Sequence, residues 1–220
     1  MKQILVVCTG NICRSPMGEI VLRDRLAAAS INDAVTVASA GVSDEEHGHG
    51  LDRRAAKVLK EAHYEVPQNH FAHRATREEL LGSDLILAMT VGHARALASQ
   101  MEAVGDDLAK LHLWREFDGT LPVAPEGVFG PGGALYDGSD GDDGNPEPAG
   151  GGQEGSARAF RDPARQRQQS NWSNFYTSDG AFDVPDPWYG TLDDFYETLA
   201  VVEAGADGIA DFLNAEKREV

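Results

Sequence analysis

The junction between the first apolar segment and the residues after it constrains the fold of this chain most. Residues 3–7 (Gln-Ile-Leu-Val-Val) form a short, mainly apolar run that is typical of a buried strand, and this run leads directly into Cys8. Pro16 suits the first turn of a helix, where its missing N–H is no loss. The sequence therefore predicts a strand, a loop over residues 8–15 and a helix, with the loop at the carboxyl end of the strand.

The remaining pattern alternates apolar strands with amphipathic helices. Four segments are expected to be strands: 3–7, 34–40, 85–89 and 111–117. Four segments with an apolar stripe are expected to be helices: 16–29, 52–63, 91–103 and 192–215. Thr76 begins a further short helix with a capping box, and Gly205 and Gly208 are expected to interrupt the last helix. This alternation predicts an α/β fold, a doubly wound four-stranded parallel sheet in flavodoxin-like order with helices on both faces.

The loop carries the residue types that phosphoryl transfer requires. Arg14 has a planar guanidinium that clamps two phosphate oxygens, and the N–H groups of such a loop surround a tetrahedral oxyanion. The positive end of the following helix faces both the anion and the sulfur of Cys8, whose thiolate is the attacking form. Ser15 places a hydroxyl beside that sulfur. We therefore expect cleavage of a phosphate ester through a phosphocysteine.

Two further loop residues support this interpretation. Gly10 permits a tight turn, and Asn11 tolerates a left-handed backbone. The structural alternative is that Cys8 only packs as a small apolar residue at the end of a strand. That alternative leaves Arg14 and the start of the helix unexplained.

A second segment, 186–189 (Asp-Pro-Trp-Tyr), offers the proton that the leaving oxygen needs. Asp186 precedes a proline that stiffens the backbone, so its carboxyl is a candidate general acid. Trp188 and Tyr189 are expected to form an aromatic wall beside the phosphate. On its own, an Asp-Pro pair in a loop is usually only a turn.

Together, residues 8–16 and 186–190 resemble the low-molecular-weight protein tyrosine phosphatase family. Three internal segments look similar as well: 39–41, 52–55 and 84–89. The resemblance covers two parts of the chain, 2–117 and 181–216. It implies an enzyme that acts on proteins containing phosphotyrosine and needs no metal or organic cofactor.

The resemblance also implies a role for each residue of the site. Cys8 is the nucleophile, and Arg14 binds the phosphoryl group and the transition state. Ser15 assists the thiolate, and Asp186 is the general acid in the first step and the base in the second. The expected substrate-binding residues are Thr9, Gly10, Asn11, Ile12, Cys13, Trp188 and Tyr189.

In this family a serine and a histidine brace the loop asparagine, and Ser39 and His70 match those positions beside Asn11. Cys13 matches a cysteine that pairs with the nucleophile under oxidation and so protects it from irreversible damage. The alternative role for Cys13 is a small packed residue on the loop. Thr90 is a departure, because many relatives carry an aspartate there.

Three other functions share the loop or the fold. Three-cysteine arsenate reductases need two more cysteines beyond the loop, and this chain has none after Cys13. Phosphoarginine phosphatases tend to have threonine after the loop asparagine, whereas Ile12 should suit a flat phenyl ring. A non-catalytic phosphate-binding protein remains a third alternative, but it has no need of a stiffened Asp186. We therefore favour phosphotyrosine.

Composition limits the partners and the location. The formal charge of −17 argues against binding to nucleic acid or to an anionic membrane surface. No secretory signal and no apolar stretch of membrane-spanning length are visible, so we expect a cytoplasmic protein without membrane insertion. His47 and His49 resemble a metal clip, but no third ligand is spaced to join them, and no metal site is expected.

One stretch does not fit the alternating pattern. Residues 118–180 hold thirteen of the 24 glycines, together with an acidic run, and they contain few branched apolar side chains. We expect a single phosphatase domain over 1–220 that is interrupted by this largely disordered insertion at about 118–180. The insertion influences closure of the loop that carries Asp186, recruits an unknown partner or is a tolerated surface segment, and we favour the last of these.

Overall fold

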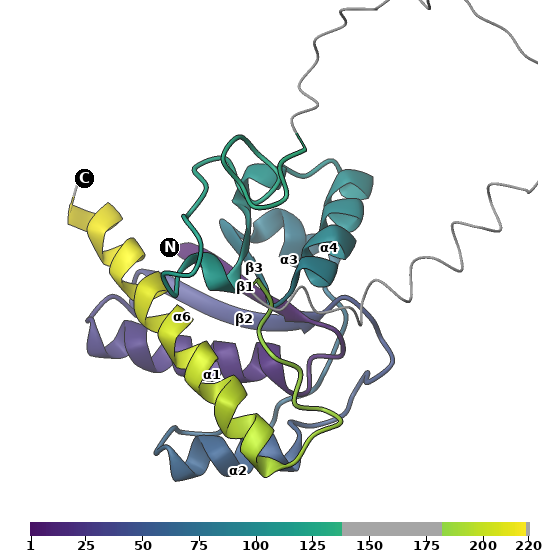
Figure 1. Cartoon of the computed structure of the whole chain (residues 1–220), viewed down its shortest axis with the longest axis vertical. Helices are drawn as coiled ribbons and strands as arrows, with labels where there is room; N and C mark the ends of the chain where they lie inside the picture. The colour runs from purple at the N-terminus through teal and green to yellow at the C-terminus, as the bar shows by residue number, and fades with distance from the viewer. Residues whose placement is uncertain (138–181, 219–220) are drawn as a thin grey trace, which may run out of the picture.

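The computed structural model describes residues 1–137 and 182–218. Within them, one sheet of four parallel strands runs in the order β2-β1-β3-β4 (Figure 1). The strands are β1 (Lys2–Cys8), β2 (Val35–Gly41), β3 (Leu85–Ala88) and β4 (Leu111–Leu113). This confirms the predicted doubly wound parallel sheet. The connections from β1 go first to β2 on one side and then back to β3 on the other, so a crevice forms beyond the carboxyl end of β1.

Helices cover both faces of the sheet. One face carries three of them: α1 (Arg14–Ala28), α2 (Arg53–Glu61) and α6 (Leu192–Arg218). The other face carries two: α3 (Arg77–Gly82) and α4 (Val91–Val104), which Figure 1 shows above the sheet. Two 3₁₀ turns flank the last strand: η1 (Leu108–Lys110) and η2 (Trp114–Glu116).

Strand β1 joins the two apolar cores. Alternate side chains of a strand point to opposite faces. Accordingly, Ile4 and Val6 pack in the core beneath α1 and α6, whereas Leu5 and Val7 pack in the core beneath α4. All four are at most 1% exposed, and burying each contributes about 1.5–3 kcal/mol. The next residue, Cys8, is therefore held at a fixed point of the fold.

The last strand is shorter than expected. It ends at Leu113, and the expected residues 114–117 begin with a 3₁₀ turn. The cause is the buried carboxylate of Glu116, which accepts the N–H groups of Leu113 at 2.7 Å and Ala124 at 3.2 Å and so draws the chain out of the sheet.

Helix α6 is continuous, so the expected interruption at its two glycines is wrong. A Cβ at Gly205 would lie 2.1 Å from Nε1 of Trp114, and a Cβ at Gly208 would lie 1.7 Å from the carbonyl oxygen of Phe117. Glycine is needed at both positions because the helix packs closely against the turn after β4.

The first part of the expected insertion is packed on the protein. Val128 is fully buried, and its N–H donates to the carbonyl of Leu111 at 2.8 Å. Leu135 in turn donates its N–H to the carbonyl of Val128 at 2.9 Å. The expectation of disorder is therefore wrong for residues 118–137, because these residues extend the core beside β4. The remainder, 138–180, lies outside the described residues.

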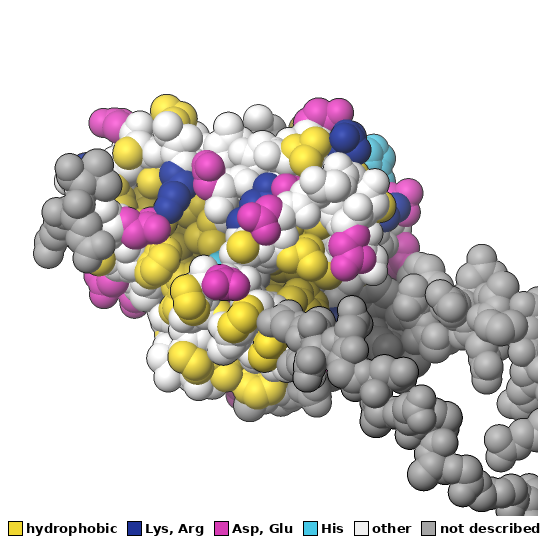
Figure 2. Space-filling model, turned by 90° about the horizontal axis from the view of Figure 1, so that it is seen from above, with side chains coloured by type: hydrophobic (Ala, Val, Ile, Leu, Met, Phe, Trp, Pro, Cys, Tyr) yellow, Lys and Arg dark blue, Asp and Glu magenta, His cyan; other side chains and the backbone are white. Residues whose placement is uncertain are grey.

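The surface mixes side-chain types. Figure 2 views the molecule from above Figure 1, and hydrophobic side chains gather in the middle of this face among acidic and basic ones. Although the chain has a net charge of −17, its acidic side chains do not form a continuous layer on this face. Among the described helices, none has both the length and the apolar character needed to cross a bilayer.

Candidate active site

The loop from Cys8 to Cys13 leaves β1 and leads into α1, which begins at Arg14. Asn11 has φ 58° and is fully buried, which matches the expected left-handed position. Gly41, at the end of β2, approaches the loop so closely that a Cβ there would lie 2.5 Å from the carbonyl oxygen of Thr9. Backbone hydrogen bonds from 42 to 8 and from 43 to 9 fasten the loop to the chain after β2. The loop conformation is thus fixed by the sheet.

The N-terminus of α1 is suited to an anion. The first N–H groups of a helix have no intrahelical acceptor, and they add to the positive end of the helix dipole. Cys13 occupies the N-cap position and makes no side-chain cap. These backbone donors therefore face the loop without a capping side chain in competition.

Ser15 connects the sulfur of Cys8 to the loop. Its Oγ lies 3.1 Å from Cys8 Sγ, donates to the carbonyl of Ala40 at 3.0 Å and accepts from Asn11 Nδ2 at 3.1 Å. The hydroxyl has one hydrogen and two neighbours that can accept it. With a thiol, the S–H donates to Oγ; with a thiolate, the hydroxyl hydrogen is within reach of the sulfur.

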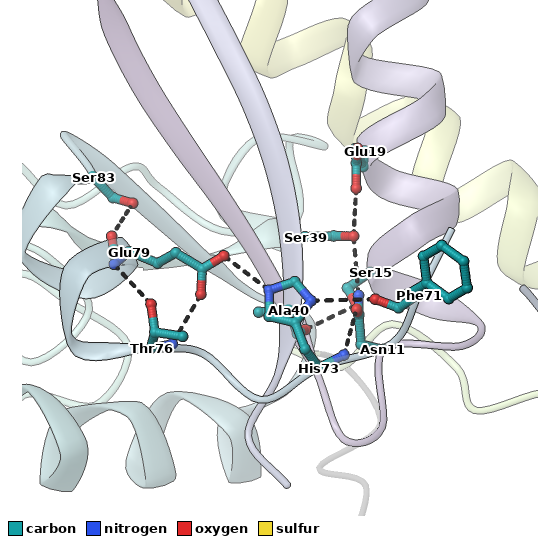
Figure 3. A network of polar contacts seen from close by, with 10 residues as sticks. All are labelled: Asn11, Ser15, Glu19, Ser39, Ala40, Phe71, His73, Thr76, Glu79 and Ser83. Atoms are coloured by element: carbon teal, nitrogen blue, oxygen red, sulfur yellow. Dashed lines mark hydrogen bonds and ion pairs between the residues drawn. The ribbon is translucent and has the colours of Figure 1, made fainter. Parts of the chain in front are cut away.

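Asn11 is the centre of a buried network (Figure 3). Its Nδ2 donates to Ser39 Oγ at 2.9 Å, and Ser39 donates to the carboxylate of Glu19 on α1. Its Oδ1 accepts the backbone N–H of His73 at 3.3 Å. Its carbonyl oxygen lies 2.7 Å from Nε2 of His70. The two expected supports, Ser39 and His70, therefore both contact Asn11, one through the side chain and the other through the backbone.

The same network reaches α3. The ring of His73 contacts Glu79 at 2.8 Å, and Glu79 closes the predicted capping box with Thr76 (Figure 3). Burial is the largest single influence on Glu79 and acts to raise its pKa. The hydrogen bonds to Thr76 and His73 together outweigh burial, so the pKa of Glu79 lies below its usual value. The loop is thus supported from α1, from β2 and from the segment before α3.

Arg14 and Asp186 meet over the loop. Arg14 Nη2 lies 2.8 Å from Asp186 Oδ2, and the arginine is 5% exposed. Together they border a pocket of about 200 Å³. Its lining residues are Cys8, Thr9, Gly10, Ile12, Cys13, Arg14, Glu45, Glu46, Asp186, Trp188 and Tyr189. The structure thus brings the expected nucleophile, cation, acid and aromatic pair to one pocket, while Asn11, Ser15, Ser39 and His70 lie behind it.

The segment 182–190, here called the acid loop, is held at two places. Near its start, Val184 donates its N–H to Met89, and Asp183 accepts the N–H of Val91 at 2.7 Å. Near its end, Arg54 on α2 donates to the carbonyl oxygens of Trp188 and Gly190, each at 3.1 Å.

The aromatic pair of the acid loop lies at the mouth of the pocket. Trp188 is 37% exposed and Tyr189 is 86% exposed. The guanidinium of Arg54 lies over the Trp188 ring at 5.8 Å and over the Phe195 ring at 4.5 Å. The wall is therefore positioned by a stacked arginine as well as by the backbone.

Cys13 stays a thiol in this site. Burial, followed by the negative charge of Asp52, raises the pKa of Cys13 far above its usual range. Asp52 caps α2 by accepting the N–H groups of Arg54 and Ala55. The surroundings of Cys13 therefore oppose its thiolate form.

Three residues that contact the site were missed by the sequence interpretation: Glu19, Arg54 and His93, whose Nε2 lies 2.8 Å from Oγ1 of Thr9. Arg54 lies inside the segment 52–55 that carried the family resemblance, so a signal for it existed. Glu19 and His93 have no motif of their own, because each acts through a single contact with a residue distant in the sequence.

Among the residues that the structure describes, no group of three His, Cys, Asp or Glu side chains has an arrangement that holds a metal ion. His49 instead pairs with Glu46 at 2.6 Å.

The chain is similar in sequence to low molecular weight tyrosine phosphatases. A family model described as low molecular weight phosphotyrosine protein phosphatase matches residues 3–140. A Streptomyces coelicolor low molecular weight protein-tyrosine-phosphatase is 30% identical over 207 residues, which are 94% of this chain and 90% of the relative.

Two solved structures are similar over nearly their whole length. Wzb from Vibrio vulnificus, in complex with benzylphosphonate, has a TM-score of 0.58 and 27% identity, covering 96% of this chain and 97% of that one. A YwlE arginine phosphatase mutant with a phosphorylated active-site serine has a TM-score of 0.61 and 25% identity, covering 98% of both chains.

Proposed function

The chain belongs to the low molecular weight phosphotyrosine protein phosphatase family, and on this premise we propose that it hydrolyses phosphotyrosine in proteins through a phosphocysteine on Cys8. One observation carries the proposal. Cys8, Arg14 and Asp186 line a single pocket, although Arg14 and Asp186 are 172 residues apart in the sequence. A nucleophile, a phosphate-binding cation and a proton donor are the groups that phosphoester cleavage through a cysteine requires.

In the first step, the thiolate of Cys8 attacks phosphorus while Asp186 protonates the leaving oxygen. Arg14 and the N–H groups at the start of α1 stabilise the charge on the remaining phosphoryl oxygens. Ser15 supports the step, because its hydroxyl hydrogen can turn from the carbonyl of Ala40 toward the sulfur. In the second step, Asp186 takes a proton from water, which hydrolyses the phosphocysteine. Neither step needs a metal or an organic cofactor.

The ion pair between Arg14 and Asp186 has a place in this cycle. The side chain of Asp186 is 39% exposed but that of Arg14 only 6%, so the pair is partly buried and the guanidinium needs an anionic partner. A bound phosphoryl group supplies that partner and so replaces the carboxylate of Asp186. Asp186 is then left beside the leaving oxygen, where it is needed as the acid.

Phosphotyrosine is favoured over phosphoarginine by the wall of the pocket. Ile12 and Trp188 present apolar surface to a flat phenyl ring. Phosphoarginine is the second candidate, because the chain is also similar to an arginine phosphatase. One apolar side chain changes selectivity by about 1–3 kcal/mol, so the preference is large but not absolute.

Glu45 and Glu46 deepen the proposal. Both line the pocket. Carboxylates at the mouth favour substrates with basic residues flanking the phosphotyrosine. Equal turnover of matched acidic and basic phosphopeptides would contradict this preference.

The test is hydrolysis of phosphotyrosine and phosphoarginine side by side, with Cys8→Ser as the control. We expect a higher kcat/KM for phosphotyrosine and a loss of about 10⁴-fold or more in the variant. A preference for phosphoarginine would mean that Ile12 does not select the phenyl ring. No turnover of either substrate by the wild-type protein would leave only a phosphate-binding role.

A further inference from the structure

A fully buried histidine on α4 contacts the loop from behind. His93 is 0% exposed, and its Nε2 lies 2.8 Å from Oγ1 of Thr9, the residue directly after the nucleophile. Its Nδ1 lies 2.9 Å from Oγ1 of Thr90, the N-cap of α4. Burial, and secondarily the charge of Arg14, lowers the pKa of His93 well below its usual range. The ring is therefore neutral at pH 7, with one nitrogen as donor and the other as acceptor.

The hydrogen-bond count favours one tautomer. Thr90 Oγ1 already accepts the backbone N–H of His93 at 3.1 Å. If Nδ1 also donated to Thr90, the Thr90 hydroxyl would accept two hydrogen bonds, and its own hydrogen would not be used in the contact with the ring. Donation from the Thr90 hydroxyl to Nδ1 uses all of these groups, and it leaves the hydrogen of His93 on Nε2, facing Thr9.

The consequence reaches the pocket through Thr9. Its Oγ1 then accepts from Nε2 of His93, and Nη2 of Arg14 lies 3.4 Å from the same oxygen. Two donors occupy the acceptor side of the hydroxyl, so its hydrogen remains for a third partner. Thr9 lines the pocket beside Cys8 and Arg14.

We propose that His93 is a positioning residue, which donates from Nε2 to Thr9 and so directs the Thr9 hydroxyl hydrogen at a phosphoryl oxygen bound in the pocket. This inference rests on the proposed function for its role in turnover, but its core is a statement about phosphate binding. The Thr9 hydroxyl is a fixed donor in a partly buried site, where a hydrogen bond to a charged oxygen is stronger than one between neutral groups.

The tautomer can be observed directly. Long-range ¹H–¹⁵N spectra of the full chain with labelled histidine distinguish a proton on Nε2 from one on Nδ1. The chain has seven histidines, and the spectrum of His93→Gln identifies the signals of His93. We expect the Nε2–H form at pH 7. A proton on Nδ1 would overturn the proposal.

Two variants separate the donor from mere packing. In His93→Gln the side-chain amide lies near the position of Nε2 and can still donate to Thr9. In His93→Asn the shorter amide lies near the position of Nδ1 and cannot. We expect His93→Asn to weaken binding of inorganic phosphate about 10-fold, measured by calorimetry on proteins shown to be folded, and His93→Gln to restore most of it. Equal losses in the two variants would contradict the proposal.

A double-mutant cycle tests whether His93 acts through Thr9. Thr9→Val should also weaken phosphate binding about 10-fold. Adding His93→Asn to Thr9→Val should reduce the phosphate affinity little further. Fully additive losses would show that the two side chains act independently and would overturn the proposal. Phosphate binding is measured without turnover, so a wild-type protein that binds phosphate but hydrolyses nothing would refute the proposed function alone.

Discussion

The loop that faces the anion and the loop that carries the acid differ in how the fold supports them. Residues 8–15, the anion loop, are braced by buried side chains: Asn11 and Ser15 are 0% exposed, and each makes hydrogen bonds to other buried groups. The acid loop is held mainly through its backbone, and Tyr189 near its end is 86% exposed.

This difference matches what each part must do. The anion loop stabilises charge best if its donors are in place before substrate arrives, because reorganisation then costs nothing during the reaction. In the proposed mechanism, the acid loop must release Arg14, give up a proton and accept one from water. Asp183 and Val184 at the start of the acid loop are buried, whereas Asp186, Trp188 and Tyr189 are exposed. Exposed segments open locally at low cost, so this support is compatible with these tasks. Substitutions in the two loops should therefore impair activity and stability in different ways.

After loss of the nucleophile itself, the largest effect is expected from Arg14→Lys in the anion loop. Lysine keeps the positive charge but loses the planar fork, so it cannot hold two phosphoryl oxygens at once. We expect kcat/KM to fall about 10³-fold with every leaving group, measured with a series of aryl phosphates. Arg53→Lys, at an exposed position, is the matched control. A loss restricted to poor leaving groups would place Arg14 in the protonation step instead.

Asp186→Asn should have the next largest effect, and its pattern should be different. The amide cannot protonate the leaving oxygen, so we expect kcat to fall about 10²-fold for poor leaving groups and much less for good ones. The slope of log kcat against leaving-group pKa measures this. The exposed Asp211→Asn on α6 serves as the control. Equal losses across the series would argue against the role as acid.

The two loops also differ in how far the sequence alone predicted them. The anion loop was predicted in detail because its residues are contiguous in the sequence. The positions of Cys8 and Arg14 are restricted by the preceding strand, by the left-handed Asn11 and by the start of the helix. The place of Asp186 was inferred from the family resemblance, because no local pattern indicates that a segment 172 residues away returns to the same pocket.

The supporting contacts were beyond the reach of the pattern. Glu19 lies on α1 among residues that read as an ordinary amphipathic helix, and its contact with Ser39 depends on the packing of α1 against β2. His93 follows an N-cap threonine, and nothing in its neighbourhood signals Thr9. The packed part of the insertion was missed for a related reason: a few apolar residues such as Val128 suffice when the sheet offers them a place.

Asn11→Gly sharpens the comparison by testing the brace itself. Glycine keeps the left-handed backbone but removes the side chain, so only the hydrogen bonds to Ser39, Ser15 and His73 are lost. We expect the unfolding free energy to fall by about 2 kcal/mol and kcat/KM by about 10-fold, measured by urea unfolding and by turnover. An unchanged stability would mean that the loop does not depend on this network.

Arg54→Gln is the counterpart in the acid loop, and the smallest effect is expected here. Arg54 is partly exposed, and it joins α2 to the acid loop through two carbonyl oxygens and a ring contact. Surface contacts of this kind contribute little to global stability, so the melting temperature should change by less than about 2 °C. If these contacts hold Asp186 in position, kcat should still fall about 3-fold to 10-fold for poor leaving groups and remain nearly constant for good ones. The variant would then lose activity with little loss of stability, whereas Asn11→Gly loses both. A large fall in stability would instead show that the acid loop is as firmly built into the fold as the anion loop.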